Sequence, residues 1–151
     1  MSVIAAVVTS EKIVLTEGVL NDDETVTIVK DETFDLEKGD RQLAYVVMGK
    51  RIRDRLSQDI DQVVLKASAG GKNAATSAVL HAAELRGVFL GAVPEGLPVK
   101  QLQKAALSRH FGSKKVDDYL KDDAFFKKRF GGADLRKGSR EAAFLLLSAR
   151  A

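Results

Sequence analysis

The chain of 151 residues has no cysteine, no tryptophan, two prolines and two histidines. The absence of cysteine excludes disulfides, thiolate zinc sites and cysteine nucleophiles, and it agrees with a reducing compartment. With only His81 and His110 present, we expect neither a histidine-rich metal site nor a histidine relay.

Long apolar runs and a basic leader are also missing. No apolar run reaches the roughly 20 residues that a membrane-spanning helix needs. The first residues, MSVIAAVVTSEK, lack the positively charged start of a secretory signal. We therefore expect a cytoplasmic protein that has no membrane partner.

The composition that remains is ordinary for a globular protein, with 45% apolar and 30% charged residues. A chain of this length can bury a core of its own without disulfides or metals. It shows no internal repeat, no low-complexity tract and no linker between domains. We therefore expect a single domain over residues 1–151.

The net charge is only +3, but basic residues gather in the last third of the chain. The clusters are Lys114 and Lys115, then Lys127, Lys128 and Arg129, then Arg136, Lys137 and Arg140. Clusters of this kind can bind the phosphates of a nucleic acid. Aspartates are interleaved with them, so the alternative is a solvated surface of mixed sign.

The apolar pattern predicts three antiparallel strands at the start of the chain. Residues 3–8 form a continuous apolar run of strand length, and residues 11–19 follow after a turn near Ser10. Residues 21–23 have turn chemistry, and residues 24–30 then alternate between polar and apolar side chains. These segments predict a three-stranded meander.

A helix is predicted next, with Asp40 as its N-cap and its end near Leu56. We expect one face to be apolar and basic side chains to point mainly elsewhere. The apolar set is Leu43, Val46, Val47, Ile52 and Leu56, and the basic set is Lys50, Arg51, Arg53 and Arg55.

The following segment contains VVLKASAGGKNAATSAVLHAAELRGVFLGA. It predicts a short buried strand over residues 60–67, a turn at Gly70 and Gly71, and a long helix over about 73–91. One face of this helix has the spacing and the small side chains for close packing on a sheet. That face consists of Ala74, Ala78, Ala82, Leu85 and Phe89.

The rest of the chain is predicted to be mainly helical. Residues 89–93 either end the long helix or begin a fifth strand, and a short helix is expected near residues 99–110. An amphipathic helix over about 114–130 should end at Gly131 and Gly132. Its phenylalanines, Phe125, Phe126 and Phe130, either pack in the core or stack on the bases of a single strand. The last helix, in SREAAFLLLSARA, is nearly all apolar and should pack into the core.

This order of elements resembles the ribonuclease H-like fold, and within it the RuvC-type Holliday-junction resolvases, over nearly the whole chain. The segment GKNAATSAVLHAAELRGVFLGA is similar to the family's second long helix, with Asn73, Ser77, Arg86 and Gly87 in place. GSREAAFLLLSA is similar to the family's Asp-x-x-Asp-Ala helix start, and PVKQLQKAAL with SKKVDDYL is a weaker match. The resemblance implies an α/β fold with a mixed sheet whose first three strands are antiparallel, flanked by helices.

The resemblance also implies two-metal phosphodiester hydrolysis by carboxylates in the first strand, at the end of the fourth strand and at the start of the last helix. Here the first-strand position falls near residues 7–9, where no acid is found, and the fourth strand ends on Lys66. The leading position of the last helix falls near Gly138, and only Glu141 keeps a carboxylate. Two close divalent cations need offsetting negative charge. We therefore expect no catalytic residues, no metal and no other cofactor, with Lys66 and Glu141 as remnants of the site.

Three roles for Lys66 stay open on the sequence alone. It can form an ion pair with Glu141 inside the former site, it can bind a phosphate, or it can point into solvent at the end of its strand.

Three functions from different classes follow. The first is a catalytically inactive RuvC-like module that binds DNA or RNA, structured or branched. Its binding residues would be Lys66, Lys72, Asn73, Lys114, Lys115, Lys127, Lys128, Arg129, Arg136, Lys137 and Arg140. The second is a protein-interaction or scaffolding subunit that forms a homodimer through helices, or joins a larger complex, with the apolar stretches VFLGAV and AAFLLLSA as candidate surfaces. The third is a divergent endonuclease that uses magnesium, with acids supplied by Asp134, Glu84 or a second subunit.

Overall fold

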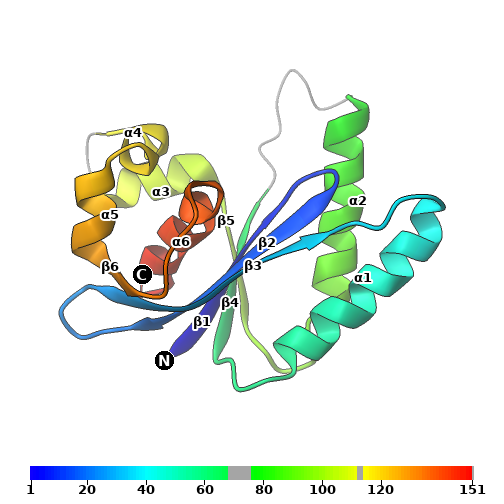
Figure 1. Ribbon diagram of the computed structural model, residues 1–151, viewed down its shortest axis with the longest axis horizontal. Coiled ribbons are helices and arrows are strands. Elements are labelled where there is room, and N and C mark those ends of the chain that lie inside the picture. The colour runs from blue at the N-terminus through cyan, green and yellow to red at the C-terminus, as the bar shows by residue number, and fades with distance from the viewer. Residues whose placement is uncertain (68–75, 112–113, 151) are drawn as a thin grey trace.

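The computed structural model describes residues 1–67, 76–111 and 114–150. Within these ranges a six-stranded mixed sheet lies between two layers of helices (Figure 1). The strands are β1 (Ser2–Val8), β2 (Lys12–Leu20), β3 (Val26–Asp35), β4 (Gln62–Lys66), β5 (Val99–Leu102) and β6 (Phe130–Gly132), in the sheet order β5-β4-β1-β2-β3-β6. The β1, β2 and β3 strands form the antiparallel meander, whereas β4 is parallel to β1, β5 to β4, and β6 to β3. The predicted fold class is confirmed.

The helices divide between the two faces of the sheet. They are α1 (Arg41–Leu56), α2 (Ser77–Ala92), α3 (Lys104–Phe111), α4 (Val116–Leu120), α5 (Asp123–Arg129) and α6 (Arg140–Leu147), with the short 3-10 helices η1 (Lys137–Ser139) and η2 (Ser148–Arg150). Figure 1 shows α1 and α2 on one face and α3 to α6 on the other. None of the described helices is both long and apolar enough to cross a membrane.

The central position of β1 in the sheet explains why the sequence of this strand is apolar without alternation. Both of its faces are buried, because Val3, Ala5 and Val7 point into the core that contains α6. Ile4, Ala6 and Val8 point into the core under α1 and α2. A strand covered on both sides gains from apolar residues at every position. The predicted place of this strand inside the sheet is confirmed.

From Ala142 to Leu147, helix α6 is apolar on every side and every residue is buried, as expected. It packs against β1, β2 and β4 on one side and against α4 on the other. Tyr119 of α4 contacts Phe144 of α6, with 5.5 Å between the ring centroids. The stretch AAFLLLSA is therefore covered within this chain and offers no surface for a homodimer.

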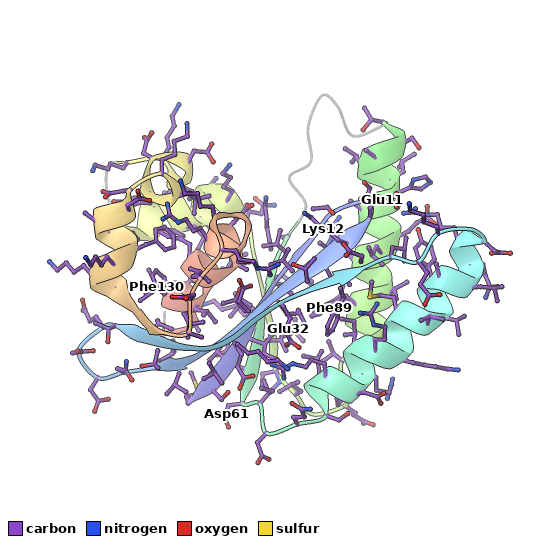
Figure 2. The ribbon with its side chains drawn as sticks, viewed as in Figure 1. Glu11, Lys12, Glu32, Asp61, Phe89 and Phe130 are labelled. Atoms are coloured by element: carbon purple, nitrogen blue, oxygen red, sulfur yellow. The ribbon has the colours of Figure 1, made fainter. Side chains whose placement is uncertain are left out.

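Helix α2 packs on the opposite face through Leu85 and Phe89, as predicted, and Figure 2 shows Phe89 between α2 and the sheet. Thr76 is its N-cap, with its Oγ1 accepting a hydrogen bond from the Val79 N–H at 3.3 Å. Residues 73–75, where we expected the helix to begin, are outside the described residues. Ala78 was expected to face the sheet, but it is exposed. Residues 89–92 end the helix rather than begin a strand.

Helix α1 begins behind Asp40 as predicted, but its buried face is not the one expected. The Asp40 carboxylate accepts hydrogen bonds from the N–H groups of Gln42 and Leu43. Leu43 and Val46 are exposed, and the buried residues are Ala44, Met48, Ile52, Arg55 and Leu56. The first turns are apolar on several sides, so periodicity alone does not select the inner face.

Arg55 was expected to point away from the core, yet it is one of the most buried charged residues described. Its Nη2 donates to Glu17 at 2.5 Å and its Nε donates to Glu32 at 2.6 Å. Burial raises the pKa of Glu32, but hydrogen bonds from Arg55 and Lys30 lower it further, so the pKa lies below its ordinary value. Glu17 and Glu32 lie on neighbouring strands, and Figure 2 labels Glu32 on the α1 side of the sheet. We call Arg55, Glu17 and Glu32 the Arg55 cluster.

Three further predictions, two of them in the second half of the chain, are wrong in detail. Residues 99–102, expected in a helix, form the parallel strand β5. The single amphipathic helix expected over 114–130 is two helices, because Asp122 accepts a hydrogen bond from the Phe125 N–H and starts a new one. Strand β3 continues to Asp35, beyond the predicted end at residue 30.

Gly131 and Gly132 do not simply end a helix but form part of β6 beside β3. Gly132 has φ 87°, and a Cβ added there would lie 2.4 Å from the Ile28 carbonyl oxygen. Only glycine fits this close backbone approach. The signal that we took as a helix stop therefore also serves the edge of the sheet.

Candidate functional site

Strand β4 ends on Lys66, and the first turn of α6 places Glu141 beside it. The Lys66 Nζ and a Glu141 carboxylate oxygen form an ion pair. The Lys66 side chain is 32% exposed and the Glu141 side chain is 26% exposed, so water reaches both partners. Of the three roles left open for Lys66, the structure shows the ion pair.

Two neighbouring positions supply no further oxygen ligand. Val7, at the first-strand position, is buried opposite Val14 in the core that contains α6. Gly138 has no side chain, and it lies in a small cleft of about 160 Å³ that is also lined by Lys12 and Arg136. In the part of the chain that the structure describes, no three His, Cys, Asp or Glu side chains gather in a way that could hold a metal ion. These residues do not fit a pair of divalent cations.

A larger cleft opens beside Lys66 at the carboxyl end of β4. Its volume is about 300 Å³, and its walls come from β1, β4, α2 and α3. The residues are Val8, Lys66, Ala67, Val79, Ala82, Arg86 and Lys104. We call it the β4 cleft. Three of its lining residues are cations, and the described lining includes no carboxylate.

Two of these cations were not among the predicted binding residues. Arg86 was noted only for its similarity to the family's helix, and Lys104 was missed. Lys104 starts α3 directly after β5, and β5 is parallel to β4, so the strand ends bring Lys104 close to Lys66. Predicting β5 as a strand would have placed Lys104 near Lys66. Lys104 forms an ion pair with Asp117 at 2.6 Å.

The predicted arginines of the last third form ion pairs within the chain. Arg129 pairs with Glu24, Arg136 with Asp31 and Arg140 with Asp123. The Arg140 guanidinium also lies 4.8 Å from the Phe126 ring centroid and donates to the Leu120 carbonyl. Each pair joins elements that are distant in sequence.

Asp31 shows how firmly one of these pairs is built. Its side chain is 5% exposed, and it accepts hydrogen bonds from the Arg136 backbone N–H and guanidinium at 2.8 to 3.3 Å. Burial raises the pKa of Asp31, but hydrogen bonds from Arg136 and Ser139 lower it more, so the pKa lies below its ordinary value. The same pair raises the pKa of Arg136.

The predicted lysines, in contrast, lie on the surface. Lys114, Lys115, Lys127, Lys128 and Lys137 are all exposed. They belong to different elements, with Lys115 before α4, Lys127 and Lys128 on α5, and Lys137 in η1. The structure does not gather them into one cleft with Lys66. Lys72 and Asn73 are outside the described residues.

The phenylalanines of α5 and β6 take the core position that was one of their two alternatives. Phe126 is buried, and its ring stacks on that of Phe130 with 5.0 Å between centroids. Phe125 packs against Tyr119, also at 5.0 Å. These rings contact one another and α6, so their faces are largely occupied.

Comparisons with known proteins bear on the fold. No family model matches the chain, and no curated protein matches it in sequence. A solved structure of Thermus thermophilus RuvC in complex with Holliday junction substrate matches with a TM-score of 0.75, covering 98% of this chain and 92% of that chain at 12% identity. This chain has the RuvC fold.

Two other resolvases share the RuvC fold with this chain. The yeast mitochondrial Holliday junction resolvase Ydc2 matches with a TM-score of 0.71 and 7% identity, over 96% of this chain and 77% of that one. The fowlpox virus Holliday junction resolvase matches with a TM-score of 0.56 and 12% identity, over 99% and 97%. On the RuvC fold, Lys66 and Glu141 occupy the strand end and helix start where the sequence resemblance implied carboxylates.

Proposed function

We propose that this chain is a nucleic-acid-binding module on the RuvC fold, which binds structured or branched DNA or RNA and does not hydrolyse it. The observation that supports this proposal best is the ion pair of Lys66 and Glu141. It puts an ammonium where two-metal hydrolysis needs a carboxylate. The solved structures of the same fold include resolvases bound to Holliday junction DNA, which favours nucleic acid as the ligand class.

The ion pair opposes metal binding in two ways. The Lys66 charge repels a divalent cation, and Glu141 already has an oxygen engaged by Lys66. Magnesium prefers octahedral oxygen ligation and gives up its waters reluctantly, so neither the apolar Val7 nor Gly138 replaces a carboxylate. We therefore assign no catalytic residue and no metal cofactor to the proposed module.

The binding surface in this proposal combines Lys66 with the exposed lysines. The long, flexible side chains of these exposed residues can reach phosphates: Lys114, Lys115, Lys127, Lys128 and Lys137. Arg129, Arg136 and Arg140 already hold carboxylates, so they contribute mainly long-range potential. Lys72 and Asn73 stay in the proposed set as a prediction.

A binding assay tests the module directly. We expect a labelled four-way DNA junction to bind in EDTA, more tightly than a duplex of the same sequence, with an affinity that falls steeply as salt rises. Adding Mg²⁺ or Mn²⁺ should produce no cleavage. If the protein instead cuts the junction with Mg²⁺, and Glu141→Gln abolishes the cutting, the chain is a nuclease and the proposal is wrong.

The endonuclease alternative finds little support in the positions of its candidate acids. Glu84 accepts a hydrogen bond from the Tyr45 hydroxyl at 3.4 Å, on the side of α2 that faces α1. Asp134 lines a different cavity, beside α5 and β6. Neither of them adds a carboxylate beside Glu141.

A protein-interaction role is the second candidate, and a different observation favours it. Leu43 is 58% exposed and Val46 is 43% exposed on α1, and Leu80 is 53% exposed on the neighbouring helix α2. Covering apolar side chains of this size with a partner is energetically favourable. A homodimer through α1 and α2, or a larger complex on this face, is therefore the alternative proposal.

Light scattering tests the dimer. If the dimer forms through these helices, Leu43→Asp should convert it to a monomer. Lys128→Asp on α5, which lies on the opposite face of the sheet, serves as the control and should not. A monomer at high micromolar concentration for the unmodified chain would remove the homodimer.

A further inference from the structure

The β4 cleft has the composition of an anion site. Lys66, Arg86 and Lys104 line it together with Val8, Ala67, Val79 and Ala82, and the described lining has no carboxylate. Apolar walls reduce the screening by water, so charges at such a surface interact more strongly with a ligand than charges in open solvent. A volume of about 300 Å³ accommodates a small polyatomic anion with some of its water.

We propose that the β4 cleft binds one phosphate group directly, with Lys66, Arg86 and Lys104 as its cationic partners and without a metal ion. The inference deepens the proposed function, on which it rests for the source of the phosphate, a nucleic-acid backbone. The three cations then take over the charge neutralisation that two divalent cations provide in two-metal hydrolysis. Binding to the phosphate is kept, and the activation of water is lost.

The carboxylates beside the cleft act as exchangeable partners. Glu141 pairs with Lys66, and Asp117 pairs with Lys104. The Asp117 side chain is 60% exposed, and ion pairs of exposed side chains contribute little to stability. A backbone phosphodiester has one negative charge, as a carboxylate has, but its two non-bridging oxygens are arranged tetrahedrally and can each accept from a different ammonium group. It can therefore recruit both ammonium groups while Glu141 and Asp117 turn towards water.

Arg86 and the start of α3 add to the attraction. Burial lowers the pKa of Arg86, because the guanidinium loses part of its hydration. Lys104 is the first residue of α3, so the N-terminal end of the helix, with its partial positive charge, lies at the rim of the cleft. Both contributions have the same sign as the two lysines.

A titration with inorganic phosphate, followed by backbone NMR in EDTA, tests the cleft without nucleic acid. We expect the amide signals of Ala67 and Lys104 to shift with a saturating dependence on phosphate. Lys104→Gln and Arg86→Gln should each weaken this binding several-fold, whereas Lys50→Gln, on the exposed side of α1, should not. If phosphate moves no amide of the cleft, or if Lys104→Gln binds like the unmodified chain, the inference is wrong.

If a phosphate displaces Asp117 from Lys104, removing the Asp117 carboxylate should strengthen phosphate binding rather than weaken it. Asp117→Asn removes the carboxylate that competes for Lys104, so it should tighten phosphate binding. An unchanged or weaker affinity in this variant would contradict the role given to Asp117. The substitution is at an exposed side chain, so a folding defect is not expected to obscure the result.

Measuring junction binding distinguishes a failure of the phosphate site from a failure of the proposed nucleic-acid-binding function. If the cleft holds a backbone phosphate, Lys104→Gln should reduce the salt dependence of junction affinity by about 1 in its logarithmic slope, and Lys50→Gln should leave it unchanged. If the junction binds with the same slope in both variants and phosphate moves no cleft amide, the inference fails and the proposed function stands. If phosphate binds in the cleft but no nucleic acid binds, the proposed function fails and the phosphate site stands.

Discussion

Two ion-paired groups lie near opposite ends of β1 and differ in nearly every physical respect. The Arg55 cluster is near its start, where Glu17 pairs with Ile4, and it faces α1. The pair of Lys66 and Glu141 is near its end and faces α6. Arg55 is 7% exposed, whereas Lys66 is 32% exposed. The first arrangement has a structural role, and the second has the accessibility that a binding site needs.

The type of cation strengthens the contrast. A guanidinium is planar and presents its donors in a fixed fork, so Arg55 can hold two carboxylates at once. An ammonium is a compact charge on a flexible chain, so Lys66 can change partner at small cost. One end of the sheet therefore has a buried ion-paired group that is fixed in place, and the other end has a cation that water reaches.

The largest expected effect comes from breaking the buried group. Arg55→Met should destabilise the fold by about 3 kcal/mol, because it removes the cation that the largely buried Glu17 and Glu32 share and leaves Glu32 with only the more exposed Lys30. Urea unfolding measures the change, and Lys50→Met on the same helix is the control. A loss below about 1 kcal/mol would show that these carboxylates reach water after all and that the contrast in burial has no energetic consequence.

Acid should also weaken the Arg55 cluster, because Glu32 belongs to it. The folded-state pKa of Glu32 and that of Asp31 lie below their ordinary values of 4.5 and 3.8. Their stabilisation is therefore present above those values and is lost as the pH falls through the lower folded-state values. Urea unfolding between pH 6 and pH 3, a range on the order of the ordinary carboxyl pKa values, should show a smaller loss of stability in Arg55→Met than in the unmodified chain. If both proteins lose the same stability between pH 6 and pH 3, Glu32 is not the source of the acid sensitivity.

Removing the accessible pair should have a smaller effect on stability. Lys66→Met and Glu141→Gln should each change the free energy of unfolding by about 1 kcal/mol or less, and the coupling in a double-mutant cycle should lie in the range of about 0.2–1 kcal/mol. Junction affinity of Lys66→Met should fall even so, because a phosphate contact is lost. A coupling of about 3 kcal/mol would make this pair as structural as the Arg55 cluster.

The smallest expected effect is on catalysis. Lys66→Glu alone should leave the chain without metal-dependent cleavage, because Val7 and Gly138 still supply no ligand. Combining it with Val7→Asp and Gly138→Asp should create measurable Mn²⁺ binding by calorimetry, although an error of about 1 Å in ligand position can still cost about a hundredfold in rate. Cleavage by the single variant would show that the remaining acids come from elsewhere.

Local patterns were enough to predict much of this structure. The unbroken apolar run of β1, the alternation of β3 and the Asp40 cap all depend on neighbours in sequence, and each was found. The pairing of Lys66 with Glu141 was one of three roles left open, because sequence shows where a charge stands but not what lies opposite. The ion pair could be predicted only because the resemblance to RuvC-type resolvases places Lys66 and Glu141 in the same site.

The errors concern residues whose environment is set by distant segments. Arg55 is buried because Glu17 and Glu32 on two strands receive it, and nothing next to Arg55 in sequence indicates this. Lys104 was missed because β5 is short and partly polar, so its pairing with β4 decides its state rather than its own pattern. Gly132 was read as a helix stop because the same backbone freedom serves a tight strand pairing.

The burial of α6 has a consequence for how the chain reaches this structure during synthesis. Strand β1 begins at Ser2, but the helix that covers one of its faces begins only at Arg140. At about 5–20 residues per second, a ribosome makes α6 on the order of ten seconds after β1. The apolar face of the sheet remains uncovered during that time. Nascent chains arrested before residue 140 should therefore stay sensitive to protease and bind chaperones, and chains that include α6 should become resistant in one step.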